Sequence, residues 1–357
     1  MKTILRTFVG CTAILFGTAC MGAVKYVPEN MKVELSLKVP GNNAVNYKLH
    51  PDKLENSYFD YEWRSDNKLP ITVFHKVEER DSCMRLTVQL TAAQDVYFNY
   101  RQLLSTGYRH DNCQFYMPGF WYRRNLRSPK KAPSFHTSDS WLVREDRLSA
   151  PLTGIFSEKE KRFMTVNRLD DFSMDALATH KEGEIILSGK TSLGFTGFEN
   201  QQGIAMLSFG FPYREAPKSY IRKLTLAPEV EAFQLMKKGE SVLLTWEIME
   251  SGADDFSDFI QHTWEHCYDT YAPKPVENSY SIADMKQVLS CFFVNSLVDN
   301  QPLVYNSGIH LKVSDCERNG QAEVGFIGRV LLNAFNAWEY GWQSNRKELK
   351  VNSTKIF

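Results

Sequence analysis

Residues 31–39 read MKVELSLKV and alternate strictly between apolar and polar side chains. The apolar positions are Val33, Leu35, Leu37 and Val39. An alternation with a period of two residues is typical of a strand that buries one face and exposes the other. We therefore expect a half-buried strand here.

Similar strand-like runs occur throughout the first 250 residues, with turn residues such as Gly183 and Gly239 between them. Further expected strands span residues 71–77, 84–90, 96–104, 162–166, 184–188, 204–209, 223–226 and 241–248. This spacing is typical of antiparallel sandwiches. Residues 24–252 are therefore predicted to form one large antiparallel β-sandwich domain.

The period changes near residue 253. Between residues 254 and 271, apolar and aromatic side chains recur at the spacing of an amphipathic helix, and Pro273 and Pro275 follow. The side chains of this pattern are Phe256, Phe259, Ile260, Thr263, Trp264, Cys267, Tyr268 and Tyr271. A second helix is expected over residues 281–298, with Ser281 as its N-cap and Asp284 in a variant of the capping box. Residues 253–315 are interpreted as linker helices, with a short extended piece in 302–313.

A third helix is expected over residues 320–342. Its apolar face would hold Val324, Ile327, Val330, Leu331, Ala334, Trp338, Gly341 and Trp342. The opposite face would hold Arg329, Asn333, Asn336 and Tyr340. Residues 348–357 contain apolar Leu349, Val351, Ile356 and Phe357 but no terminating signal. The predicted class is α+β, with the sandwich first and an all-α region beginning at residue 316.

The first residues have the pattern of an export signal. Lys2 and Arg6 precede a short apolar run at residues 8–16, which is too brief to span a membrane. Cleavage is expected after Ala19 or Ala23. A lipid anchor on Cys20 is the alternative, because residues 17–20 form a partial lipobox. The mature chain is expected in the periplasm or on the cell surface of a bacterium.

The charge balance and the cysteine content restrict the possible classes of function for this protein. Lys plus Arg and Asp plus Glu number 42 each, and this balance argues against a general nucleic-acid binder. After residue 16, no apolar run is long enough to predict a transmembrane helix. Five cysteines follow the signal, at spacings that match neither a disulfide framework nor a zinc site. They are Cys83, Cys113, Cys267, Cys291 and Cys316.

Residues 114–147 concentrate aromatic and arginine side chains between Gly and Pro. Aromatic rings can cover the apolar face of a sugar, and arginine can bind a uronate or sulfate with two hydrogen bonds. The expected substrate-binding residues are Trp121, Tyr122, Arg123, Arg124, Trp141 and Arg144. The other interpretation makes the aromatics core and the arginines a solvated rim. Asp139, Glu145 and Asp146 would then be ion-pair partners.

Residues 262–266 read HTWEH and match the H-x-x-E-H signature of inverted zinc peptidases. A helical wheel centred on Ile260 turns His262 and His266 towards solvent, where an ion would lack a dry cavity. Glu339 could serve as a third ligand by spacing alone. We therefore expect neither a metal nor a cofactor in this protein.

The order of elements resembles that of exported glycoside hydrolases of Bacteroides-type bacteria, in which a β-supersandwich precedes an (α/α)6 toroid, the six-hairpin glycosidase fold. The likeness rests on YMPGFWYR at residues 116–123 and GQAEVGFIGR at residues 320–329. It implies a carbohydrate-active enzyme acting on a polysaccharide, with a uronate-containing glycan as one option. A toroid needs about twelve helices, or at least ~200 residues, so the chain is expected to end early in that domain.

Glu323 is a catalytic candidate, since a carboxylate near a helix N-terminus is favoured by the helix dipole. The same position is explained as well by ordinary first-turn acidity. Two functions remain open from the sequence. One is the N-terminal part of a glycoside hydrolase, inactive if its catalytic domain is incomplete. The other is a non-catalytic glycan-binding or structural surface protein.

Overall fold

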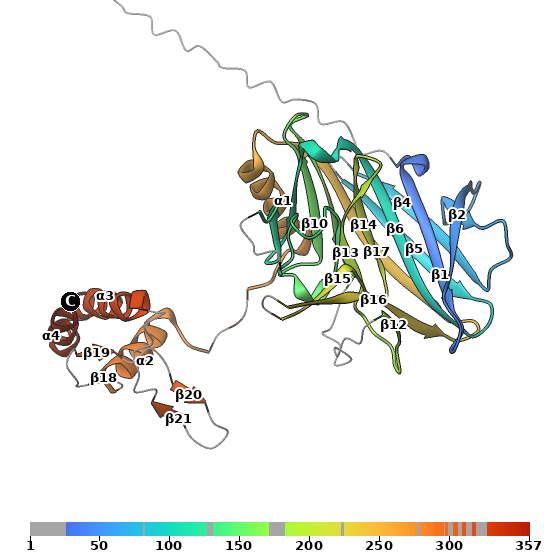
Figure 1. Cartoon of the computed structure of the whole chain (residues 1–357). Helices are drawn as coiled ribbons and strands as arrows, with labels where there is room; N and C mark the ends of the chain where they lie inside the picture. The colour runs from blue at the N-terminus through green and yellow to red at the C-terminus, as the bar shows by residue number, and fades with distance from the viewer. Residues whose placement is uncertain are drawn as a thin grey trace, which may run out of the picture. The chain divides into compact units, whose positions relative to one another are not determined.

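A computed structural model shows the chain as two compact units, divided between Tyr271 and Ala272 (Figure 1). The structure describes residues 26–80, 83–126, 131–170, 183–222, 225–275, 277, 279–295, 297–298, 303–305, 309–311, 316–318 and 327–357. The predicted signal with Cys20, and the candidate Glu323, lie outside these residues.

Unit 1 is dominated by antiparallel strands. In chain order they are β1 (Met31–Lys38), β2 (Val45–Lys53), β3 (Tyr61–Arg64), β4 (Ile71–Glu79), β5 (Cys83–Ala92), β6 (Val96–Arg109), β7 (Cys113–Met117), β8 (Trp121–Arg123), β9 (Trp141–Arg144), β10 (Leu152–Ser157), β11 (Arg162–Arg168), β12 (Gly183–Ile186), β13 (Phe195–Gln201), β14 (Ile204–Phe211), β15 (Arg214–Arg222), β16 (Thr225–Met236) and β17 (Ser241–Gly252). The described residues of this unit also include the single-turn 3-10 helices η1 (Pro28–Asn30), η2 (His110–Asn112) and η3 (Glu145–Arg147).

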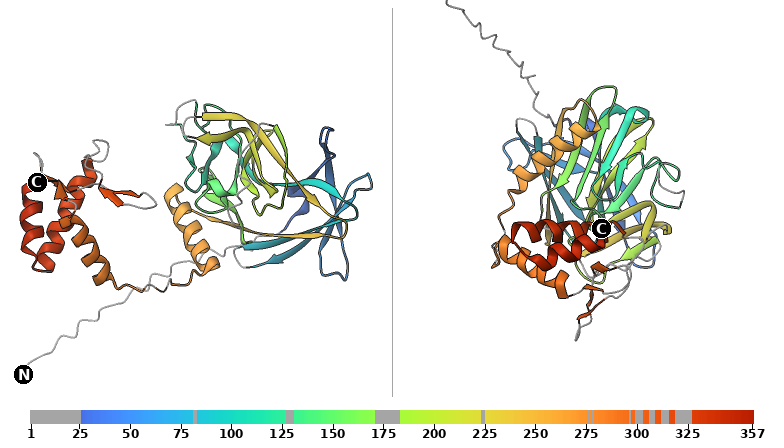
Figure 2. Two further views of the ribbon diagram at one scale, coloured as in Figure 1. Left: turned by 90° about the horizontal axis from the view of Figure 1, so that it is seen from below. Right: turned by 90° about the vertical axis from the view of Figure 1, so that its left-hand side faces the viewer.

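Most of these strands form two layers that share β2, while β12, β15 and β16 form a further small sheet in which β16 pairs with both β12 and β15. One layer has the order β2-β1-β6-β14-β13-β9. The other has the order β2-β3-β4-β5-β17-β11-β10-β7-β8. Strand β2 joins them because residues before His50 pair with β1 and residues from His50 onward pair with β3. Figure 2 shows the layers from two further directions.

The apolar core lies between the layers. Leu35 of β1 pairs with Tyr100 of β6 in one layer, and both side chains are fully buried. Phe209 of that layer meets Trp246 of the other, with ring centroids 5.2 Å apart. The alternation that predicts the strands therefore points their apolar side chains into a shared interior, which is the usual arrangement of a sandwich. The predicted α+β class and the β-rich first region are confirmed.

Helix α1 (Phe256–Tyr271) belongs to unit 1 and packs on the outer face of the second layer (Figure 1). Its buried stripe is Phe256, Phe259, Thr263 and Cys267. The Phe259 ring occupies space beside Gly154, where a Cβ atom would come within 2.6 Å of the ring. A glycine in β10 thus permits the close approach of helix and sheet.

The described residues of unit 2 contain three helices, α2 (Ile282–Asn295), α3 (Ile327–Gln343) and α4 (Lys347–Ile356). The predicted capping box is confirmed, because the Asp284 backbone N–H donates to Ser281 Oγ and the Ser281 backbone N–H donates to Asp284 Oδ2. The second helix is shorter than predicted, since residues after Asn295 include strand β18 (Leu297–Val298). The other short strands are β19 (Val304–Tyr305), β20 (Ile309–Leu311) and β21 (Cys316–Arg318).

The buried face of α3 differs from the predicted one. Ala334 and Ala337 are buried and pack with Leu349 of α4, while Leu331 and Trp342 of the predicted apolar face are exposed. Helix α4, which was not predicted from the sequence, supplies this partner. Gly341 is the close-approach point, because a Cβ there would lie 3.0 Å from Leu349. Among the described residues, no helix is long and apolar enough to cross a membrane.

One buried histidine gives the fold a pH dependence. His75 is fully buried, its Nε2 lies 2.7 Å from Tyr100 Oη, and burial lowers its pKa from 6.5 to about 3. Between these values the unfolded chain binds a proton that the folded chain does not, so the free energy of unfolding falls as the pH falls. The slope reaches about 1.4 kcal/mol per pH unit.

We expect urea unfolding to show a smaller loss of stability between about pH 7 and pH 5 in His75→Gln than in the parent chain. Carboxylates contribute little in this window because their unperturbed pKa values are lower. The matched control is His50→Gln, an exposed histidine on β2. An unchanged slope in His75→Gln would show that other groups set the pH dependence.

Candidate functional site

The predicted binding stretch folds into two hairpin strands, a loop and a third strand. Strands β7 and β8 pair, with Tyr116 opposite Tyr122 and Met117 opposite Trp121. Gly119 takes a φ of +79° in the turn between them, a conformation that favours glycine. Strand β9 follows and pairs with β13. The stretch therefore belongs to both layers of the sandwich.

Two of the six predicted binding residues are core residues. Trp121 and Trp141 are 0% exposed, and their ring centroids are 5.9 Å apart. The Trp121 indole N–H donates to the Arg123 carbonyl, and the Trp141 indole N–H donates to the Ser138 carbonyl. Each ring is therefore enclosed by apolar neighbours while its polar atom is satisfied. The prediction that these two rings stack on a ligand is wrong for this structure.

Arg124 and Arg144 also serve the fold. Arg124 is half-buried, donates to the backbone carbonyls of Cys113 and Asp111, and lies over the Phe135 ring. Arg144 is buried and holds Asp146 with two hydrogen bonds, of 2.6 and 2.5 Å. Both guanidinium groups are thus occupied by the protein, and buried Arg144 does not belong to the solvated rim that the other interpretation expects.

The neighbouring acidic residues are held in the same way. Glu145 is buried and accepts hydrogen bonds of 2.7 Å from the Arg168 side chain and of 2.7 Å from the Gly194 backbone N–H. Burial raises the pKa of the Glu145 carboxyl, against the opposing effect of Arg168. Asp139 accepts from the Asn200 side chain. These acids are structural partners. The predicted pairing with an arginine of the same stretch is confirmed for Asp146, which pairs with Arg144, whereas Glu145 pairs with Arg168 outside the stretch.

Tyr122 and Arg123 are the two predicted residues that reach the surface. Tyr122 is 52% exposed, and its ring lies 5.4 Å from that of buried Tyr116. Arg123 is exposed, and its guanidinium lies 5.1 Å above the ring of Phe256 at the start of α1. The hairpin thus presents one aromatic ring and one charged fork beside the helix.

Helix α1 adds exposed aromatic residues to this surface that were not among the predicted binding residues. Trp264, Tyr268 and Tyr271 are exposed and fall at i, i+4 and i+7, on one flank of the helix. The Trp264 indole N–H donates to Tyr116 Oη at 2.8 Å, which connects this flank to the hairpin. We call the four exposed rings Tyr122, Trp264, Tyr268 and Tyr271 the aromatic ridge. The helical period of residues 254–271 was the signal that could have identified these rings, but the sequence prediction placed them on the buried apolar face.

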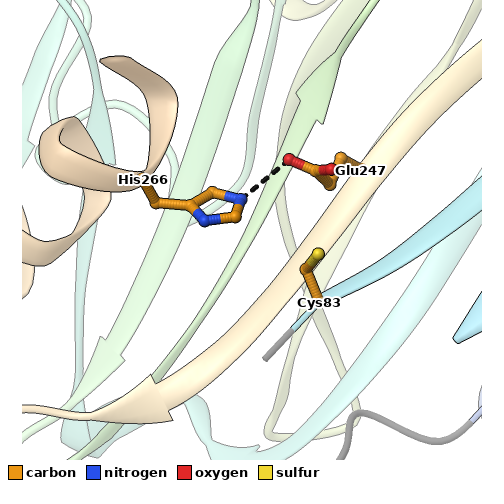
Figure 3. Close-up of side chains that lie close together, drawn as sticks. All are labelled: Cys83, Glu247 and His266. Carbon is orange, nitrogen blue, oxygen red and sulfur yellow. Dashed lines mark hydrogen bonds and ion pairs between the residues drawn. The ribbon is translucent and has the colours of Figure 1, made fainter. Parts of the chain in front are cut away.

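The two histidines of the H-x-x-E-H sequence have different partners. His262 Nε2 lies 3.4 Å from Asp258 on the exposed side of α1. His266 is only 24% exposed, and its Nε2 lies 2.7 Å from Glu247 Oε1 of β17 (Figure 3). The prediction that both point to solvent is therefore wrong for His266. The wheel was centred on Ile260, whereas the buried stripe is centred nearer Phe259 and Thr263.

Around Glu247 the polar groups are closely coupled. Burial acts to raise the pKa of Glu247, but hydrogen bonds from His266 and Thr270 hold it below its usual value. Burial raises the pKa of the Cys83 thiol, and the nearby Glu247 carboxylate adds to this effect. Cys83, Cys113, Cys267 and Cys291 are all free thiols.

Adjacent residues of β8 provide a direct test of these placements. Trp121→Ala should lower the free energy of unfolding by about 3–5 kcal/mol, because it empties a packed aromatic core. Tyr122→Ala should change it by no more than about 0.5 kcal/mol, because most of that ring already contacts water. Chemical denaturation of the two variants measures the difference. Similar losses in both would place Tyr122 in the core.

Comparisons with known proteins give only slight likenesses. No family model and no curated protein matches the chain. A structural-genomics protein from Synechocystis sp. PCC 6803 aligns with 65% of this chain and 77% of its own, at 7% identity and a TM-score of 0.32. A polysaccharide lyase aligns with 91% of this chain and 52% of its own, at 11% identity and a TM-score of 0.32. An α-galactosidase from Geobacillus stearothermophilus, solved with raffinose, aligns with 61% and 30%, at 10% identity and a TM-score of 0.29. Likeness at this level assigns no activity to this chain.

Proposed function

We propose that this chain is an exported carbohydrate-active protein whose unit 1 binds a glycan along the aromatic ridge. The observation that carries the proposal is the gathering of exposed rings on the hairpin and α1 beside the exposed Arg123. Exposed aromatic side chains gathered on one surface of a soluble protein often mark a binding site.

The dimensions of the ridge suit an extended ligand. From Trp264 to Tyr271 the helix rises about 10 Å, so the three rings of α1 form a row rather than a single spot. Tyrosine and tryptophan present an apolar face together with a polar edge. A sugar chain has the matching alternation of C–H faces and hydroxyl groups. A row of rings therefore suits several successive sugar units.

Two rings of the ridge are fixed in place before any ligand arrives. The Trp264 indole is held by its hydrogen bond to Tyr116. Tyr271 Oη donates to Asn167 Oδ1 at 2.8 Å. Rings that are already ordered lose little conformational freedom on binding, which favours affinity.

Arg123 supplies the charge preference in this proposal. A guanidinium group can bind the carboxylate of a uronate or a sulfate group with two parallel hydrogen bonds. The side chain lies over Phe256, next to the ridge rather than at a distance from it. We therefore propose a uronate-containing or sulfated glycan in preference to a neutral one.

Export and hydrolysis are further parts of the proposal. Export to the periplasm or cell surface is supported by the basic and apolar pattern of residues 1–19. Hydrolysis is supported by the sequence resemblance to six-hairpin glycoside hydrolases. The alternative is a glycan-binding protein without catalysis, which the ridge supports equally well. Release of reducing ends from a bound polysaccharide would distinguish these two functions.

In affinity gel electrophoresis, the chain should be retarded by polygalacturonate more than by a neutral galactan. Tyr122→Ala combined with Tyr268→Ala should reduce the retardation by at least about tenfold in apparent affinity, since stacking contacts are lost. Arg123→Gln should weaken binding to polygalacturonate more than to a neutral chain, because it removes the charged fork.

The matched control is Tyr58→Ala, which removes an equally exposed ring far from α1 in sequence, before β3. Its retardation should equal that of the parent chain. Retardation that is the same for the parent, the double variant and the control would remove the ridge from the binding surface. Loss in all three variants would indicate non-specific binding.

A further inference from the structure

Three side chains with metal-binding atoms converge where α1 crosses the second layer. Cys83 begins β5, Glu247 lies in β17 and His266 lies in α1. One ligand atom from each residue lies within 4.8 Å of the other two (Figure 3). The register of β5 and β17 brings two of these residues together, because Cys83 pairs with Met249 and Arg85 pairs with Glu247. Cys83 and Glu247 are therefore diagonal neighbours on the same face of the sheet.

We propose that Cys83, Glu247 and His266 bind a divalent transition-metal ion of the zinc class. A thiolate, an imidazole nitrogen and a carboxylate oxygen are the three ligand types that zinc accepts in proteins. In a tetrahedral site with ordinary bond lengths, ligand atoms lie about 3–4 Å apart. The cluster is close to this spacing, so small side-chain movements suffice to close it around an ion.

The charges of the site balance. On binding, the Cys83 thiol gives its proton to solvent, so one thiolate and one carboxylate neutralise the two charges of the ion. Neutrality matters here because Cys83 and Glu247 are 6% and 3% exposed. A charge buried without compensation would be costly. A fourth position would remain for water or another oxygen ligand.

Residues around the cluster can hold its ligands in place. Thr270 Oγ1 donates to Glu247 Oε1 at 3.0 Å, and Arg85 Nη2 lies 3.6 Å from Glu247 Oε2. Such outer partners orient metal ligands. In the metal-free protein, the bond between His266 and Glu247 holds the two ligands together, and the ion would replace that bond.

This site differs from the peptidase signature and from the aromatic ridge. Of the two histidines in H-x-x-E-H it uses only His266, and its acid comes from β17. His266 and Thr270 lie on the flank of α1 opposite Trp264 and Tyr268. An ion bound here would connect α1 to two strands of the sheet. Its expected role is to stabilise unit 1.

The test is a titration of the tag-free, metal-free full chain with Co²⁺ and then Zn²⁺. We expect one ion per chain, a thiolate-to-cobalt charge-transfer band that Zn²⁺ abolishes, and a higher melting temperature with either ion. Cys83→Ser and His266→Gln should each weaken binding by at least about 100-fold, since loss of an outer partner alone costs about 10–100-fold.

The matched controls are His262→Gln, on the same helix, and Cys291→Ser, at an exposed cysteine. Both should bind as the parent chain does. Absence of the charge-transfer band in the parent chain would overturn the proposal, whatever the variants do. Equal loss in His262→Gln and His266→Gln would also overturn it, because it would assign binding to the helical histidine pair. Circular dichroism of each metal-free variant verifies that it is folded.

Discussion

The burial of one stripe of α1 against the outer face of the sandwich is the contact on which both proposed sites depend. Phe256, Phe259, Thr263 and Cys267 face the sheet. Burial of a phenylalanine such as Phe259 contributes about 1.5–3 kcal/mol. This contact also fixes the rotation of the helix about its axis. One flank then presents rings to solvent, and the other brings His266 to Glu247.

Local chemistry made much of the fold predictable. The alternation in residues 31–39 depends only on neighbouring side chains, and β1 (Met31–Lys38) buries Met31, Val33 and Leu35 as that pattern requires. The pattern fails at its end, where Ser36 is buried and Val39 is exposed. The Ser281–Asp284 capping box is equally local, since both partners lie within one helical turn. Signals of this kind depend only on residues that are close in the sequence, so they can be recognised without knowing the distant contacts of the fold.

The candidate sites were harder to predict because they depend on which aromatic residues are enclosed. Trp121 and Trp264 are the same residue type, yet only the first is surrounded by other strands. Treating Trp264, Tyr268 and Tyr271 as core moved the predicted apolar centre towards Ile260, and His266 was then assigned to solvent. Cys83 approaches Glu247 only because β5 pairs with β17, and these two strands are far apart in the sequence. At the N-terminus of α4 no side chain caps the backbone with a hydrogen bond, so there was little indication in the sequence of where this helix begins.

The place of α1 within unit 1 bears on where this chain can be divided. The residue pattern changes at about position 253, but the compact unit continues to Tyr271, and Ala272, with a φ of +40°, Pro273 and Pro275 follow. A gene fragment cut where the strands end would leave Phe156 and Phe163 without their cover and would invite aggregation. A fragment cut after the helix keeps that surface closed, and so defines the smallest sensible version of the sandwich for expression and crystallisation.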